Sequence, residues 1–229
     1  MQKLFICLLG MTLLGSSLHA QDKFRVGILL SPIISTIRVS DSVGNDFDGD
    51  SNGKFGFAYG LMLNWDAGEN FGFHSGARIV HKHFKVEQDI QINGSAPRSE
   101  QKVRINTLEI PAAIFGRSNE IGDGYRIIGQ FGVSFNFTIG YKNEWDNVNP
   151  VTLETGGSGT LRDSDRVDSF VMDFVFGVGG EKTFVDVGTV SAGIFYHQAL
   201  NDINNDNNPG INNELRLSYF SFDLSYYFN

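Results

Sequence analysis

The strongest constraint on the fold is an alternation of apolar and polar residues that recurs along most of the chain. In residues 125–141, YRIIGQFGVSFNFTIGY, every second residue from Tyr125 is mostly apolar, and those between are mostly polar or small. Successive side chains of a strand point to opposite faces, so this period indicates a strand with one apolar face. The chain carries further segments of this kind, strongly at 54–65, 170–178 and 220–228, and weakly at 24–38, 71–86, 103–117 and 185–200. Eight strands and no helix are therefore expected after the first 20 residues.

The links between these segments alternate between long and short. In chain order, long polar links follow segments 24–38, 71–86, 125–141 and 185–200. Short links follow segments 54–65, 103–117 and 170–178, and the last of these is a tight turn expected near GGEKT at 179–183. In an up-and-down meander, all long links then lie at one end, as in outer-membrane barrels. We predict an all-β fold: an eight-stranded antiparallel up-and-down transmembrane β-barrel with short periplasmic turns and long extracellular loops. The last strand is expected to pair with the first.

The alternative is a soluble barrel with an apolar interior, and three observations argue against it. The segment 125–141 has 17 residues, whereas strands of soluble proteins usually have about 5–6. An eight-stranded interior is too narrow for the large apolar residues of every strand. Aromatic residues lie toward strand ends, as in the girdles of membrane barrels, with Tyr59 as a mid-strand exception; these residues are Trp65, Tyr125, Tyr141, Tyr196 and Tyr226. The apolar face is therefore expected to contact lipid.

The first 20 residues have the pattern of a secretory signal peptide. Lys3 precedes an apolar run at 4–14, and small residues lead to Ala20. We expect a signal peptide at 1–20 and a barrel domain at 21–229, which directs the protein to the bacterial outer membrane. The expected partners are outer-membrane lipid and lipopolysaccharide, and the barrel assembly machinery during insertion. The only cysteine, Cys7, lies in the signal, so disulfides are excluded, and the net charge of −8 argues against nucleic acid.

Three segments resemble the PorT-type outer-membrane β-barrel proteins of Bacteroidetes, often called the porin family. They are KFRVGILLSP directly after the signal, LEIPAAIFG at 108–116, and the aromatic final strand. The chain departs from the pattern at its end, because Asn229 follows the terminal aromatic residue Phe228. The resemblance implies the barrel fold and the outer-membrane location. One named member of that family serves a protein-secretion apparatus, but no motif here indicates that role.

Charged residues on the non-lipid faces are the first candidate site. Buried charges need partners, so we expect a polar network that holds the barrel interior together rather than a solute path. Its expected members are Arg78, Glu109, Arg126, Asp173 and Asp223.

Two weak metal-binding patterns are present, and no cofactor is expected. The acidic loop DGDSNG suggests a calcium site at Asp46, Asp48, Asp50 and Asn52, but the twelfth position of an EF-hand would be Tyr59, so a solvated loop is favoured. His81 and His83 share a strand face, yet two ligands are too few for a metal site. Lys82 and Lys85 nearby are expected to contact lipid phosphate groups.

The remaining features indicate no catalytic site and concern the folding of the barrel instead. His74 and Ser75 are neighbours in a strand and face opposite ways, so they form no catalytic pair, and we expect no enzyme. Pro32 and Pro111 each predict a bulge or local bend. The aromatic final strand resembles the insertion signal that the assembly machinery reads, with its apolar residues at Phe220, Phe222, Leu224, Tyr226 and Phe228.

The sequence thus favours a non-enzymatic, structural or loop-mediated binding protein of the cell envelope. A narrow passive porin and a PorT-like component of a secretion apparatus remain as alternatives.

Overall fold

The computed structural model describes residues 24–41, 46–47, 53–89, 98–148, 155–161, 167–203 and 213–228. These residues form ten strands of one sheet: β1 (Phe24–Asp41), β2 (Asp46–Phe47), β3 (Lys54–Asp66), β4 (Phe71–Asp89), β5 (Arg98–Arg117), β6 (Tyr125–Val148), β7 (Thr155–Leu161), β8 (Phe170–Phe184), β9 (Gly188–Ala199) and β10 (Asn213–Phe228). The described part of the chain contains no helix of the length and apolarity that crossing a membrane requires.

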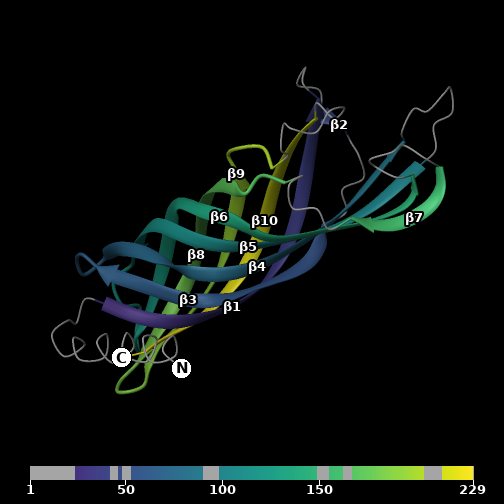
Figure 1. The fold of residues 1–229 in the computed structure, drawn as a ribbon. Helices are drawn as coiled ribbons and strands as arrows, with labels where there is room; N and C mark the ends of the chain where they lie inside the picture. The colour runs from purple at the N-terminus through teal and green to yellow at the C-terminus, as the bar shows by residue number, and fades with distance from the viewer. Residues whose placement is uncertain are drawn as a thin grey trace, which may run out of the picture.

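Eight of these strands close into a barrel, which confirms the predicted fold. Each of β1, β3, β4, β5, β6, β8, β9 and β10 pairs antiparallel with the next, and β10 returns to pair with β1. The two remaining strands extend the sheet: β2 pairs with β1, and β7 pairs with β6. Figure 1 shows β7 and the neighbouring strand ends projecting past the barrel, away from the end with the short turns.

The strands are staggered, and the stagger can be followed residue by residue. One row of paired residues runs around the barrel through Phe24, Trp65, Phe73, Ile114, Phe131, Phe176, Tyr196, Phe220 and Ile34. The row leaves β1 at Phe24 and returns to it at Ile34, so the stagger is 34 − 24 = 10 residues. A stagger of this size in eight strands requires them to tilt, at about 35–45° to the barrel axis.

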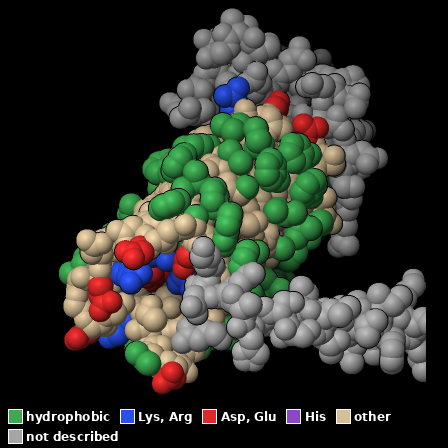
Figure 2. All heavy atoms as spheres, turned by 90° about the vertical axis from the view of Figure 1, so that its left-hand side faces the viewer, with side chains coloured by type: hydrophobic (Ala, Val, Ile, Leu, Met, Phe, Trp, Pro, Cys, Tyr) green, Lys and Arg blue, Asp and Glu red, His purple; other side chains and the backbone are tan. Residues whose placement is uncertain are grey.

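The apolar face of each strand points outward, as the alternation predicts. Six large apolar side chains at alternate positions of β3 are 38–68% exposed, at Phe55, Phe57, Tyr59, Leu61, Leu63 and Trp65. The residues between them, such as Ala58 and Met62, are buried inside the barrel. Figure 2 shows the resulting apolar covering along the side of the barrel. Near the short turns, the Trp65 ring lies 6.0 Å from Phe24 and 5.3 Å from Phe73.

A bulge in β6 overturns one predicted face. Thr107 pairs with Thr138, but the preceding Asn106 pairs with Gly140, so Ile139 is an extra residue in β6. Beyond it the inward and outward positions of β6 exchange, as any one-residue slip requires. Tyr141 consequently pairs with buried Ile105 and packs against apolar residues of the lumen. The prediction that Tyr141 belongs to the outer aromatic girdle is wrong for this reason.

The short turn before β9 also differs from the prediction. The chain turns at 185–187, where Asp186 has φ +63° and the Val187 amide donates to the Phe184 carbonyl over 3.2 Å. The segment GGEKT instead continues β8, in which Gly179 pairs with Gly193 of β9. Its two glycines suggested a turn, but here they lie in extended strand.

The two prolines interrupt pairing without a bulge. On β1, Leu30 pairs with Leu224 and Ile33 with Ser221, so the register across Pro32 is unchanged. The register from β4 to β5 is likewise the same on both sides of Pro111. A missing amide removes one ladder bond but inserts no residue, so the bulge predicted at each proline is wrong, and the local bend stays a prediction.

Candidate functional site

The barrel lumen gathers the charged side chains and is the candidate functional site. At its centre Arg78 of β4 forms two ion pairs with carboxylates from other strands. Its Nη2 atom lies 2.5 Å from Glu109 Oε1, and its Nη1 atom lies 3.3 Å from Asp223 Oδ2. Arg78 and Glu109 are 3% and 0% exposed, so each charge depends on the other for compensation.

Hydrogen bonds extend this pair toward the opposite wall. The Tyr219 hydroxyl donates to Glu109 Oε2 over 2.5 Å, and the Tyr219 ring stacks on His197 with centroids 4.1 Å apart. On the other side the Ser31 hydroxyl donates to Asp223 Oδ1 over 2.7 Å. A network from β1, β4, β5, β9 and β10 therefore crosses the barrel.

A second ion pair joins the same network. Lys82 Nζ lies 3.6 Å from Asp173 Oδ2, donates to Asn136 Oδ1 over 3.1 Å, and sits 4.8 Å from the centre of the Tyr219 ring. Lys82 is 2% exposed, so the prediction that it contacts lipid phosphate is wrong. Lys82 lies four residues beyond Arg78 on one strand, and that even spacing places both on the inner face.

The structure brings together four of the five charges that the sequence placed in the lumen. Arg78, Glu109, Asp173 and Asp223 meet in one cluster, whereas Arg126 lies at the end with the short turns. Sequence reasoning did not find the buried His197 and Tyr219, because each lies in a strand whose inner face also carries apolar residues. The signal that could have found them is their position in the strand: each alternates with outward apolar residues and therefore points inward.

A separate charged cluster lies at the end with the short turns. Arg25 and Arg117 alternate with Asp66 and Glu181: Arg117 lies 2.7 Å from Asp66 and 2.9 Å from Glu181, and Arg25 lies 3.5 Å from each. Arg117 and Asp66 also line an open cleft of about 640 Å³ that includes Arg126. Figure 2 shows acidic and basic side chains gathered around this mouth of the barrel.

The opposite end of the lumen is filled by an apolar cluster. Its buried members are Phe84, Val103, Ile105, Val167, Val171, Ala199, Ile203 and Leu217, and Tyr141 packs against them. Between the central network and the charged mouth there is a cavity of about 30 Å³, lined by Met62, His74 and Tyr227 among others. A cavity of that size holds water but no larger solute. The described lumen is thus packed along its length.

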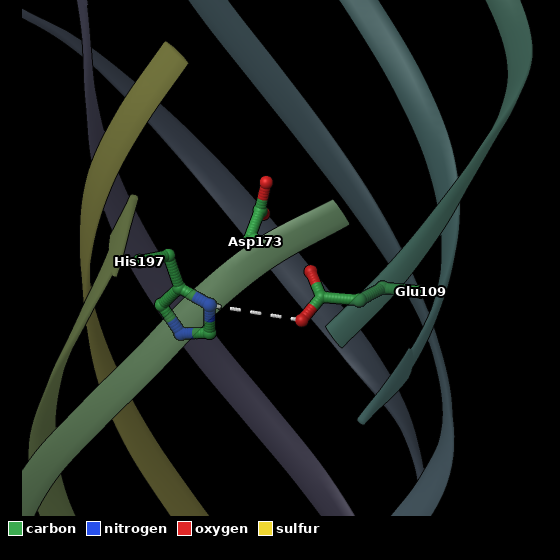
Figure 3. A group of neighbouring side chains, drawn as sticks. All are labelled: Glu109, Asp173 and His197. Atoms are coloured by element: carbon green, nitrogen blue, oxygen red, sulfur yellow. Dashed lines mark ion pairs between the residues drawn. The ribbon is translucent and has the colours of Figure 1, made fainter. Parts of the chain in front are cut away.

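Glu109, Asp173 and His197 are the one group of potential metal ligands found among the described residues (Figure 3). Their ligand atoms lie within 4.8 Å of one another, and His197 Nδ1 is 3.7 Å from Glu109 Oε1. The cationic groups of Arg78 and Lys82 already neutralise both carboxylates, however. A divalent ion would have to displace two buried cations, so this donor set does not fit a metal.

The lumen also brings together a serine, a histidine and a carboxylate, the residue types of a catalytic triad. Ser221 Oγ lies 3.4 Å from His197 Nε2, and His197 Nδ1 faces Glu109. Arg78 Nη2 lies 3.1 Å from the same Nε2 atom and can only donate to it, so this nitrogen is not free to accept the serine proton. Ser221 is 0% exposed, and a substrate cannot reach it. The arrangement is packing rather than an active site.

The remaining predicted sites are placed as follows. Asp48, Asp50 and Asn52 lie outside the described residues, and Asp46 is described only as the start of β2. His81 Nδ1 lies 2.7 Å from Asn106 Oδ1, and His83 Nδ1 donates to the Phe55 carbonyl over 3.1 Å, so each imidazole has a separate partner. His74 contacts Asn64, at 2.6 Å, and not Ser75. The apolar residues of the final strand point outward on β10, which closes the barrel.

No protein-family model and no curated protein sequence matches the chain. Solved structures with a similar chain path include Neisserial surface protein A (11% identity, 87% of this chain and 96% of that one, TM-score 0.42). They also include the attachment invasion locus protein Ail of Yersinia pestis (11%, 90% and 99%, 0.38) and the outer membrane protein OprG from Pseudomonas aeruginosa (9%, 90% and 96%, 0.49). At these identities and TM-scores the likeness carries no argument about function. The barrel assignment rests on the strand pairing itself.

Proposed function

We propose that this protein is an integral outer-membrane β-barrel that conducts no solute, catalyses no reaction and acts as a membrane-anchored scaffold for its long-loop end. The observation that carries the proposal is the contrast between the two surfaces of the barrel wall. Outside, apolar side chains such as Phe55 and Leu61 are more than half exposed. A soluble monomer rarely exposes a continuous apolar surface of this extent, whereas lipid covers one on every membrane barrel.

The inside of the wall argues against a porin. The ion-paired network around Arg78 crosses the lumen, and the apolar cluster around Ile105 fills its long-loop end. Conduction would require both to move, at the cost of separating buried charges. The narrow-porin alternative is therefore disfavoured.

The long-loop end supports the scaffold role. β4, β5 and β6 extend as a paired sheet as far as the Glu100–Asp146 pair, and β7 adds to β6 at Thr155–Leu161. Such extensions hold a binding surface above the membrane at a fixed orientation. The resemblance of the segments now seen in β1 and β5 to PorT-type proteins is consistent with this proposal, but no structural observation favours a secretion role.

Planar-bilayer recording of the purified, refolded chain tests the proposal. We expect no steady single-channel openings under conditions in which an open porin, added as a positive control, conducts. Steady openings would establish the porin alternative. A chain that stays folded and monomeric in buffer without any amphiphile would refute the membrane location itself. Loss of secreted proteins on deletion of the gene would favour the secretion alternative.

A further inference from the structure

We infer that the outer face of β4–β6, directly above the apolar belt, binds the phosphate groups of phosphorylated lipids in the outer leaflet. This inference rests on the membrane-spanning role proposed above and assigns that surface a ligand. The binding residues are Lys85 of β4, Lys102 and Arg104 of β5, and Lys142 of β6.

Strand register places these cations side by side. Lys85 pairs with Lys102, and Arg104 pairs with Lys142, so the four residues occupy two adjacent rows on three neighbouring strands. Lys142 faces outward because the bulge at Ile139 exchanges the faces of β6 beyond it. Without that extra residue, Lys142 would point inward and Tyr141 outward.

The patch begins where the lipid-facing surface ends. On the outer face of β5, apolar Ile110 and Leu108 are followed by Asn106, Arg104 and Lys102. Arg104 lies four residues beyond Leu108, which is a rise of about 10 Å along a barrel of tilted strands. The polar layer of a bilayer extends about 5–8 Å beyond the hydrocarbon on each side, and a long side chain reaches across the difference. The cations are therefore level with lipid headgroups.

The charge of the patch is opposite to that of the whole chain. The two rows that hold these four cations contain one carboxylate, Glu144, so they carry a net charge of 4 − 1 = +3 in a protein of net charge −8. The next row from the belt is acidic and holds Glu87, Glu100 and Asp146, of which Glu100 forms ion pairs with Lys85 and Lys102. Arg104 and Lys102 have side chains that are 52% and 59% exposed, so both present donors to a ligand. A phosphate group accepts hydrogen bonds from several such donors at once.

Glu100 and Glu144 hold the cations in place and compete with the phosphate ligand for them. Lys85 lies 2.9 Å from Glu100, Lys102 lies 3.3 Å from it, and Lys142 pairs with Glu144. The hydrogen bond from Lys85 keeps the pKa of Glu100 below its usual range, so this carboxylate is ionised at neutral pH. Its removal should therefore raise the affinity for phosphate, whereas removal of the cations should lower it.

Native mass spectrometry of the refolded barrel in neutral detergent tests the inference, with three probes: a bisphosphorylated glucosamine lipid, phosphatidylcholine and inorganic phosphate. We expect the unmodified protein to retain the bisphosphorylated lipid in preference to phosphatidylcholine. The double variant Lys102→Gln/Arg104→Gln should bind it about tenfold more weakly, on the basis of about threefold for each exposed charge contact. Glu100→Gln should bind it more tightly, and added salt should weaken binding.

Lys182→Gln is the matched control, because it removes a half-buried cation beside Tyr125, at the end with the short turns, and should leave lipid binding unchanged. A gel-mobility comparison of heated and unheated samples verifies that each variant folds. Equal retention by the unmodified protein and the double variant, in folded samples, would overturn the inference while leaving the membrane role intact. Competition by inorganic phosphate at the same concentration would overturn the assignment to lipid. A chain that takes up no amphiphile at all would remove both proposals together.

Discussion

Tyr219 and Glu109 lie 110 residues apart in the sequence and meet inside the barrel, where the tyrosine hydroxyl donates to the carboxylate over 2.5 Å. The same carboxylate accepts from Arg78, so one acidic side chain links β4, β5 and β10. In a closed sheet such a link fixes strands that are not neighbours. The network therefore contributes to the stability of the closed form rather than to chemistry.

Glu109→Gln should lower the free energy of unfolding by about 3–5 kcal/mol, because it leaves the buried Arg78 without its nearest counter-charge. Urea titration of the protein in lipid vesicles measures this loss. Glu69→Gln is the control: it removes an exposed carboxylate from the short turn before β4 and should leave the urea midpoint unchanged. Equal midpoints for the Glu109 variant and the unmodified protein would mean that Asp223 alone compensates Arg78.

Phe131→Arg tests which face contacts lipid. Phe131 is 56% exposed and lies near the middle of the outward apolar residues of β6, which run from Tyr125 to Ile139. A cation at the bilayer midplane costs about 2–4 kcal/mol. Urea titration in vesicles should show a loss of this size, and Phe131→Leu should show a much smaller one. A stable Phe131→Arg variant would contradict the assignment of this face to lipid.

The sequence predicted the barrel because its strongest signal, the period of two, is the one that a barrel wall requires on every strand. It also placed Arg78, Glu109, Asp173 and Asp223 correctly inward, since each sits between outward apolar neighbours. The prediction of inward and outward faces failed where a bulge adds one residue to a strand. The bulge at Ile139 carries no composition signal, yet it reverses the faces of β6 beyond that point.

The packed interior was also only partly predictable. The inner faces of several strands carry large residues such as Phe84, Leu217 and Tyr219, although a narrow lumen was expected to hold mainly small and polar side chains. Tyr219, for example, packs in one buried cluster with the small Ala58, which β3 contributes. Which large residue faces which small one depends on the stagger, and periodicity within one strand does not determine it.

Two isoleucines on β5 allow the stability contributed by the lumen cluster to be compared with that contributed by the lipid-facing surface. Ile105 is 1% exposed and belongs to the apolar cluster, whereas Ile110 is 37% exposed and points outward. Ile105→Ala should cost about 2–5 kcal/mol, because it removes buried methyl groups and leaves a cavity. Ile110→Ala should cost less, because lipid fills the space left by the side chain. Equal losses in urea titration would argue that the cluster is loosely packed.

The final strand should be needed for insertion as well as for stability. Tyr226 and Phe228 lie 5.2 Å apart between ring centres at the end of β10, and the Tyr226 hydroxyl donates to the Val187 carbonyl over 2.6 Å. In Tyr226→Ser/Phe228→Ser we expect less heat-modifiable, folded protein in the membrane fraction. The control, Phe57→Ser/Leu61→Ser on β3, removes a similar outward apolar area away from the chain terminus. If both double variants lose the same amount of folded protein, lost contact with lipid explains the defect, and β10 carries no separate insertion signal.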